Sequence, residues 1–272
     1  MYTDGFELAK KLEENINSVF VGKEEVVENL LVCLLGGGHV LLEDVPGVGK
    51  TTLAGTLARS MECSFGRIQF TPDTLPGDVA GVSVYDMKTG EFRYQPGAVM
   101  NQVLLADEIN RTAPKTQASL LEAMAEGQVT VDGTVYPLPR PFFVIATQNP
   151  IEFLGTYPLP EAQMDRFMMR LNIGYPDREQ EIKMATEFLQ GNTAQKAEAV
   201  CRAEDILTLR KDVADITVKE ALLGYMEDII QATRLEERFV LGASPRAMLA
   251  LLRASQAKAF LQKRGYVKPD DV

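Results

Sequence analysis

The clearest candidate for chemistry in this sequence is a glycine-containing loop that follows a short apolar run, residues 39–43, and precedes a stretch with helical periodicity. Glycines let backbone N–H groups approach phosphate oxygens, and the start of a helix adds the positive end of its dipole. Lys50 would contact the β- and γ-phosphates of a nucleotide, and the Thr51 hydroxyl would bind Mg²⁺. The sequence therefore predicts a nucleotide site made by Asp44, Val45, Pro46, Gly47, Val48, Gly49, Lys50, Thr51 and Thr52.

One position departs from the phosphate-loop pattern G-x-x-x-x-G-K-[ST], because Asp44 stands where the first glycine is expected. Aspartate adopts unusual backbone angles more readily than most residues, so the turn is expected to survive the replacement. The alternative interpretation is a plain strand-to-helix turn with an exposed lysine.

Two adjacent acids end a second apolar run, residues 103–106. Asp107 would help to hold the Mg²⁺ shell, and Glu108 would polarise the water that attacks the γ-phosphate. Taken alone, such a pair could equally be an acidic helix start that is favoured by the helix dipole.

Three further polar residues could complete this chemistry. Asn149 follows the run 142–147, and its amide can bind both a γ-phosphate oxygen and a water molecule. Arg166 precedes the last expected strand, and Arg246 follows Ser244 and Pro245, a cap and first-turn pair that begins a helix. Arginines commonly neutralise charge on a transferring phosphoryl group, although either one could be a surface ion-pair partner.

Composition restricts the classes of function. The chain has 28 basic and 38 acidic residues, a net charge of −10, so no general attraction to nucleic acid or anionic lipid is expected. Three widely spaced cysteines fit buried thiols in a reducing compartment. No apolar run approaches the roughly 20 residues that span a bilayer, which predicts a cytoplasmic protein without membrane insertion.

The order of expected elements indicates an α/β fold. Five short apolar runs, residues 39–43, 67–70, 103–106, 142–147 and 168–173, alternate with segments of helical length, which predicts a parallel sheet between helices. Residues 82–99 and 129–138 are expected to be hairpin insertions, the second around Asp132-Gly133. After Pro176 the periodicity is helical throughout, so we expect domains at 1–175 and 176–272.

Several stretches together give the chain a close resemblance to the MoxR family of AAA+ ATPases. They are RIQFTPDTL (67–75), LADEINR (105–111), PKTQASLLEAMAE (114–126), ATQNP (146–150), GTYPLPEAQMDRF (155–167) and GASPRA (242–247). The resemblance covers essentially the whole chain. It implies an α/β AAA+ P-loop core followed by a small helical lid. Members of the family usually have a further lid helix after the position that corresponds to Val272.

The resemblance also implies residue roles. Lys50 and Thr51 match the Walker A motif, Asp107 and Glu108 match Walker B, and Asn149 matches sensor 1. Arg246 matches sensor 2, and Arg166 matches the arginine finger, which in this superfamily acts on the nucleotide of a neighbouring subunit. The segment Val21-Gly22 resembles the lining of the adenine pocket.

A site completed by a neighbour implies a homo-hexameric ring with ATP and Mg²⁺ as cofactors. The family further implies chaperone-like remodelling of a protein client, including cofactor or metal insertion, commonly with a partner that bears a von Willebrand factor type A domain. Two other functions stay open. One is a nucleic-acid motor, which the net charge of −10 disfavours. The other is a scaffold that binds ATP without hydrolysing it, which the joint presence of Glu108, Asn149, Arg166 and Arg246 disfavours, because a scaffold would not need residues for hydrolysis.

Overall fold

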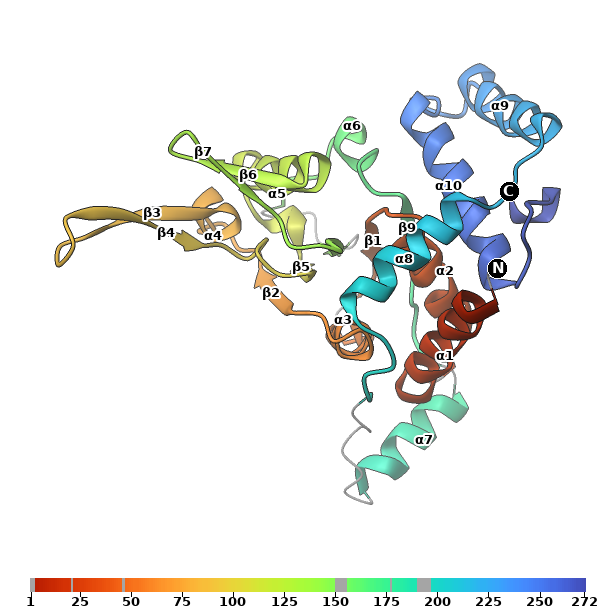
Figure 1. Cartoon of the computed structure of the whole chain (residues 1–272), viewed down its shortest axis with the longest axis horizontal. Helices are drawn as coiled ribbons and strands as arrows, with labels where there is room; N and C mark the ends of the chain where they lie inside the picture. The colour runs from red at the N-terminus through yellow and green to blue at the C-terminus, as the bar shows by residue number, and fades with distance from the viewer. Residues whose placement is uncertain (1–2, 21, 46, 150–155, 177, 190–196) are drawn as a thin grey trace.

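A five-stranded parallel sheet forms the centre of the computed structural model, which describes residues 3–20, 22–45, 47–149, 156–176, 178–189 and 197–272 (Figure 1). Its strand order is β2-β5-β8-β1-β9, with bounds β1 Val40–Glu43, β2 Phe65–Gln69, β5 Val103–Asp107, β8 Phe143–Gln148 and β9 Met169–Leu171. Each strand overlaps one of the five apolar runs, so the expected parallel sheet is confirmed, although β2 begins two residues earlier than its run and β9 is shorter than its run.

Both faces of the three central strands, β5, β8 and β1, are buried, as their continuous apolar sequences predict, whereas the edge strands β2 and β9 have no buried residue. Successive residues of a strand point to opposite faces, and they accordingly enter two different hydrophobic clusters. In β1, Val40 and Leu42 belong to one cluster and Leu41 belongs to the other. Strands β5 and β8 divide in the same way, so the sheet separates two cores.

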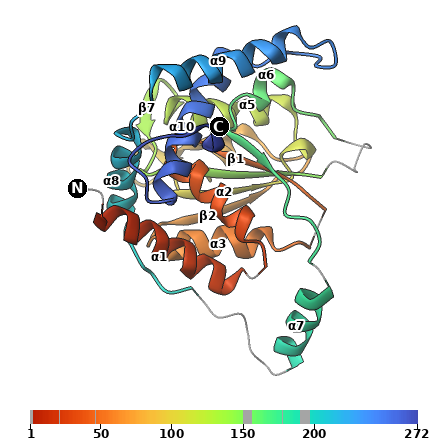
Figure 2. The ribbon, with the colours of Figure 1, turned by 90° about the vertical axis from the view of Figure 1, so that its right-hand side faces the viewer.

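Helices from both ends of the chain cover the first face (Figure 2). These are α1 Thr3–Val19, α2 Glu24–Leu35, α3 Lys50–Ser60, α8 Ala203–Ala214 and α10 Pro245–Leu261. Helix α10 packs on α2 and on α8. The C-terminal helices therefore share one continuous core with the N-terminal helices.

The second face is covered by helices from the middle of the chain and by the second of two hairpins, while the first hairpin projects away from the body of the protein (Figure 1). The elements are α4 Pro76–Ala80, β3 Gly81–Asp86, β4 Glu91–Pro96, η1 Ile109–Arg111, α5 Pro114–Glu126, β6 Gln128–Val131, β7 Thr134–Pro137 and α6 Glu161–Met164. Asp132 and Gly133 both have positive φ, as the tight turn of the second hairpin requires. Both expected hairpins are confirmed.

From residue 178 onward, the described chain is helical apart from one isolated bridge. It comprises α7 Arg178–Leu189, α8, α9 Glu220–Leu235, α10 and η2 Pro269–Asp271. This architecture, an α/β core with a parallel sheet between helices followed by a helical region, is the predicted one. The boundary near Pro176 stays a prediction. Within the described residues, no helix is long and apolar enough to cross a bilayer.

The single histidine is a structural part of the core. His39 is 9% exposed, and its Nδ1 accepts a hydrogen bond from the Val144 N–H at 3.1 Å. Its Nε2 therefore carries the proton and lies 3.4 Å from the Met124 carbonyl oxygen. Protonation of Nδ1 would break the bond to Val144, and burial lowers the pKa of His39 to about 4.

We expect stability to fall as the pH is lowered from about 6.5 towards 4, because the unfolded histidine binds a proton in this window and the folded one does not. The difference is worth up to about 3 kcal/mol. Urea unfolding of the wild type and of His39→Gln, which retains a donor and an acceptor, should give free energies that converge as the pH falls. Parallel pH profiles would contradict this assignment.

Candidate nucleotide site

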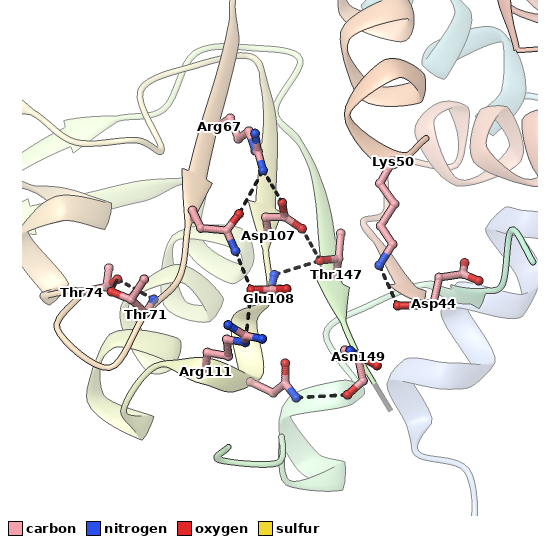
Figure 3. A network of polar contacts seen from close by, with 12 residues as sticks. Asp44, Lys50, Arg67, Thr71, Thr74, Asp107, Glu108, Arg111, Thr147 and Asn149 are labelled. Carbon is pink, nitrogen blue, oxygen red and sulfur yellow. Dashed lines mark hydrogen bonds and ion pairs between the residues drawn. The ribbon is translucent and has the colours of Figure 1, made fainter. Parts of the chain in front are cut away.

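The candidate catalytic residues meet at one edge of the sheet, where β1, β5 and β8 end (Figure 3). The carboxyl ends of parallel strands lie on the same side, and this is where α/β proteins usually bind ligands. In Figure 3, Asp107, Glu108 and Thr147 are grouped at the centre, with Lys50 and Asp44 to their right and Arg67 above Asp107.

The loop after β1 has the backbone of a phosphate cradle. Gly47 and Gly49 both have φ of 90°, which residues with a side chain rarely adopt. A Cβ at Gly47 would meet nothing within 4 Å, so the space above this glycine is open. Helix α3 begins directly after Gly49, and Thr51 and Thr52 in its first turn are exposed. Val45 and Val48 pack against the core below the loop.

Asp44 has a structural function at the position of the missing glycine. Its carboxylate accepts hydrogen bonds from the N–H groups of Ile173 at 2.5 Å and Gly174 at 2.9 Å, and the residue is 4% exposed. Its φ is not positive, so it needs no glycine-like backbone. These bonds engage N–H groups just after β9, and this explains why that strand ends at Leu171 although the apolar run continues to residue 173.

Lys50 is positioned by the same residue. Its Nζ donates a hydrogen bond to the Asp44 carbonyl oxygen at 2.8 Å. Partial burial lowers the pKa of Lys50, while the charges of Asp44, Asp107 and Glu108 act in the opposite direction. The ammonium group therefore lies within the electrostatic field of the two acids that end β5.

Thr147 at the end of β8 connects those two acids. Its hydroxyl donates to Asp107 Oδ1 at 2.7 Å and accepts from the Glu108 N–H at 2.8 Å. Glu108 has φ of 58° and ψ of 49°, a left-handed conformation that is unfavourable for a residue with a side chain. Backbone strain of this kind is often found at functional sites. Thr147 thus holds Glu108 in a defined orientation next to Asp107.

Besides Thr147, three charged or polar side chains that were not among the expected site residues contact these acids. Arg67 Nη2 lies 2.7 Å from Asp107 Oδ2, Gln69 Nε2 donates to Glu108 Oε2 at 2.6 Å, and Arg111 Nε lies 3.2 Å from the same oxygen. Arg67 and Gln69 are two residues apart on β2 and so share a face, and Gln69 is directly opposite Asp107 in the register. This two-residue spacing was the available signal, but it becomes informative only when β2 is known to pair with β5.

Asn149 follows β8 and is 7% exposed, and its carbonyl oxygen lies 3.5 Å from Asn110 Nδ2. It is thus at the same edge as the acids. Of the expected adenine-pocket residues, Gly22 accepts a hydrogen bond from Gln180 Nε2 of α7 at 3.0 Å, and Val21 lies outside the described residues. Pro46 of the loop also lies outside them.

Among the described residues, no hydrogen bond or ion pair joins the two candidate arginines to Lys50, Asp107 or Glu108. Arg166 Nη1 donates to the Ala162 carbonyl oxygen at 3.3 Å, and Arg246 is exposed. Their neighbours connect them: the Ser244 hydroxyl donates to Asp165 Oδ1 at 2.6 Å while it accepts from the Ala247 N–H at 3.0 Å. This contact joins the end of α6 to the start of α10, so the segments that carry both arginines are held together.

The residues at the strand ends fit a nucleotide with Mg²⁺. Mg²⁺ in such sites is usually held by one or two protein oxygens together with phosphates and water. The Thr51 hydroxyl and the Asp107 carboxylate are oxygen ligands of this type, and the open space above Gly47 leaves room for phosphates. A cavity of about 630 Å³ begins at Thr51 and Thr52 and extends along α3.

Comparison with known proteins gives consistent results. The sequence model described as the ATPase family associated with various cellular activities (AAA) matches residues 39–169, and an AAA lid domain matches residues 231–272. YeaC of Bacillus subtilis is 51% identical over 97% of this chain and 83% of its own. Chaperone MoxR1 of Mycobacterium tuberculosis is 43% identical over 94% of this chain and 70% of its own.

A solved structure shows the same similarity. A Cytophaga hutchinsonii protein assigned as an ATPase superposes with a TM-score of 0.90 at 40% identity, and the match covers 98% of this chain and 83% of that one.

Proposed function

The chain belongs to the MoxR family of AAA+ ATPases, and on this premise we propose that it binds ATP with Mg²⁺ and hydrolyses it in an oligomeric ring to remodel a protein client. The observation that carries the proposal is the connection made by Thr147. The Thr147 hydroxyl holds together Asp107, a carboxylate suited to bind Mg²⁺, and Glu108, a carboxylate suited to act as a general base. Both acids act on the charge of Lys50, which follows the phosphate loop.

The residues of this chain would divide the reaction between them. The N–H groups of the loop and the Lys50 ammonium would bind the β- and γ-phosphates, and Thr51 and Asp107 would hold the metal. Glu108 would accept a proton from the attacking water, and the Asn149 amide would orient that water against the γ-phosphate. When bound, Mg²⁺ would neutralise negative charge on the phosphates.

Glu108 is engaged elsewhere in this structure, because Gln69 and Arg111 both contact its Oε2. An unpaired carboxylate is the better base, so we expect catalysis to require release of at least one contact. Arg67 likewise contacts the Asp107 carboxylate that a metal would need. The strand β2 thus holds both acids in a state that nucleotide binding would have to rearrange.

The two arginines support a site shared between subunits. Arg166 makes no hydrogen bond or ion pair with Lys50, Asp107 or Glu108 in the described structure, and the hydrogen bond between Asp165 and Ser244 joins its segment to the one that carries Arg246. We propose that Arg166 contacts the nucleotide of the next subunit in a hexamer. By analogy with the family, the client would be a protein complex undergoing maturation or cofactor insertion, with a von Willebrand factor type A domain partner.

ATP turnover measured against protein concentration tests this proposal, with the assembly state followed by light scattering in the same samples. Turnover per subunit is expected to rise with assembly, because each site needs its neighbour. Lys50→Ala should abolish nucleotide binding and turnover, since it removes the charge that pairs with the phosphates. Lys115→Ala, an exposed lysine on α5, is the matched control. Tight ATP binding without turnover at any concentration would favour the gated scaffold instead.

A further inference from the structure

A second cavity, of about 370 Å³, lies where α8 and α10 pack against the end of α2. It is distinct from the nucleotide site, because Gly36 and Gly37 in its wall precede β1 whereas the phosphate loop follows that strand. The side chains that matter for its chemistry are Arg210, Arg253, Gln256, Val213, Leu249 and Leu252. We call this cavity the arginine pocket.

Arg210 lines the arginine pocket and carries a hydrogen-bond donor that is buried beneath the pocket surface and unpaired. Its Nε donates to the Leu34 carbonyl oxygen at 2.9 Å and so anchors the guanidinium at the end of α2. Its Nη2 is buried and has no hydrogen-bond partner. Burial lowers the pKa of Arg210 to about 10, and the positive charge of Arg253 acts in the same direction. A buried donor without an acceptor is unfavourable, and a modest rotation of the guanidinium would let this nitrogen donate to an acceptor in the pocket.

Arg253 brings a second positive charge to the same pocket. It is exposed, and its Nη1 lies 3.7 Å from the position that a Cβ on Gly37 would occupy. Among the residues that the structure describes, no carboxylate lies within 4.0 Å of either guanidinium. The acid Glu28 on α2 is already paired with Lys258, at 2.7 Å. Two like charges therefore meet without a counter-charge.

The chemistry of the pocket selects the kind of ligand. Two guanidinium groups with free N–H donors match the oxygens of a phosphate group, which arginine binds through paired hydrogen bonds. Two positive charges also favour a dianion over a single carboxylate. The volume is at the lower end of the range for small-molecule sites, and Val213, Leu249 and Leu252 supply apolar wall.

We propose that the arginine pocket binds a small phosphate monoester, with the phosphate between Arg210 and Arg253 and the organic part against the apolar wall. Such a ligand would join α8 and α10 of the helical region to the end of α2 in the core. This inference goes beyond the proposed ATPase function and does not depend on it.

Calorimetric titration with phenyl phosphate, in saturating Mg·ADP so that the phosphate loop is occupied, tests the proposal. We expect saturable binding, tighter than that of inorganic phosphate because of the apolar wall. Arg253→Gln should raise the dissociation constant by roughly tenfold or more, since it removes one of the two charged contacts. This variant decides the matter because Arg253 has no partner in the described structure whose loss would affect folding.

The matched control is Lys211→Gln, which removes one positive charge from an exposed residue next to Arg210 on the same helix. It should bind phenyl phosphate like the wild type, and Arg210→Gln, if folded, should not bind it. Failure of the wild type to saturate below about 10 mM would overturn the proposal. Equal affinity of Arg253→Gln would do the same. So would binding that disappears on assembly, because a neighbouring copy would then fill the pocket.

Discussion

Glu108→Gln is expected to bind ATP as the wild type does and to hydrolyse it about 10²–10⁴-fold more slowly. Glutamine keeps the size of the side chain and its hydrogen-bonding oxygen but cannot accept a proton from water at neutral pH. The Glu108 N–H bond to Thr147 belongs to the backbone, so the connection to Asp107 should persist in the variant. Single-turnover hydrolysis, measured beside equilibrium binding of a fluorescent ATP analogue, separates the two effects.

The control for this prediction is Glu122→Gln, which changes an exposed acid on α5. It should leave both binding and turnover unchanged. Equal loss of binding in Glu108→Gln and Lys50→Ala would contradict the division of roles, because it would make Glu108 part of the binding surface. Unchanged turnover in Glu108→Gln would remove it from catalysis.

The fold could be predicted largely because local pattern and tertiary environment agree. The apolar runs that became β1, β5 and β8 are buried on both faces, so hydrophobicity alone marks them. The helix α4 and the short helix α6 were not anticipated, because each is a single turn or little more and lacks periodicity. Helix α8 was not singled out either, although its stripe of Ile206, Leu209 and Val213 is buried.

Residues of the candidate site could be predicted only where a single sequence segment determines their position. Lys50 and Thr51 follow directly from the loop sequence, and Asp107 and Glu108 follow from the end of a strand. Thr147 and Gln69 could not be recognised in this way. Their importance depends on which strands are neighbours and in what register, and a parallel sheet leaves that open at the level of sequence.

Asp44 illustrates a different limit. The sequence motif predicts that this position contacts phosphate. Its side chain instead accepts hydrogen bonds from two backbone N–H groups of the segment after β9. A buried carboxylate requires such donors, and the donors lie far along the chain. The arginine pocket could not be predicted from the sequence for the same reason. Arg210 and Arg253 lie on separate helices, which come together only in the folded protein.

Arg166→Ala is expected to reduce ATP turnover by about 10³-fold or more while leaving the affinity of a single subunit for ATP intact. The reason is that a finger stabilises charge in the transition state, and in the described structure Arg166 makes no hydrogen bond or ion pair with Lys50 of its own chain. Arg178→Ala, an exposed arginine at the start of α7, serves as the control and should retain activity.

Mixed rings give the sharper form of this test. Arg166→Ala subunits retain Glu108, and Glu108→Gln subunits retain Arg166, so neither preparation should turn over ATP alone. In an equal and random mixture, about a quarter of the interfaces would pair an intact Glu108 with an intact Arg166 from the neighbour. Turnover should therefore recover to about a quarter of the wild-type rate. A finger that acts within its own subunit could give no recovery, because no single chain in the mixture has both residues. The Asp165–Ser244 hydrogen bond extends this argument to Arg246, since it holds the start of α10 beside the finger. Recovery of turnover would therefore assign Arg166 to the face that meets the next subunit, with the start of α10 hydrogen-bonded to the segment that carries it.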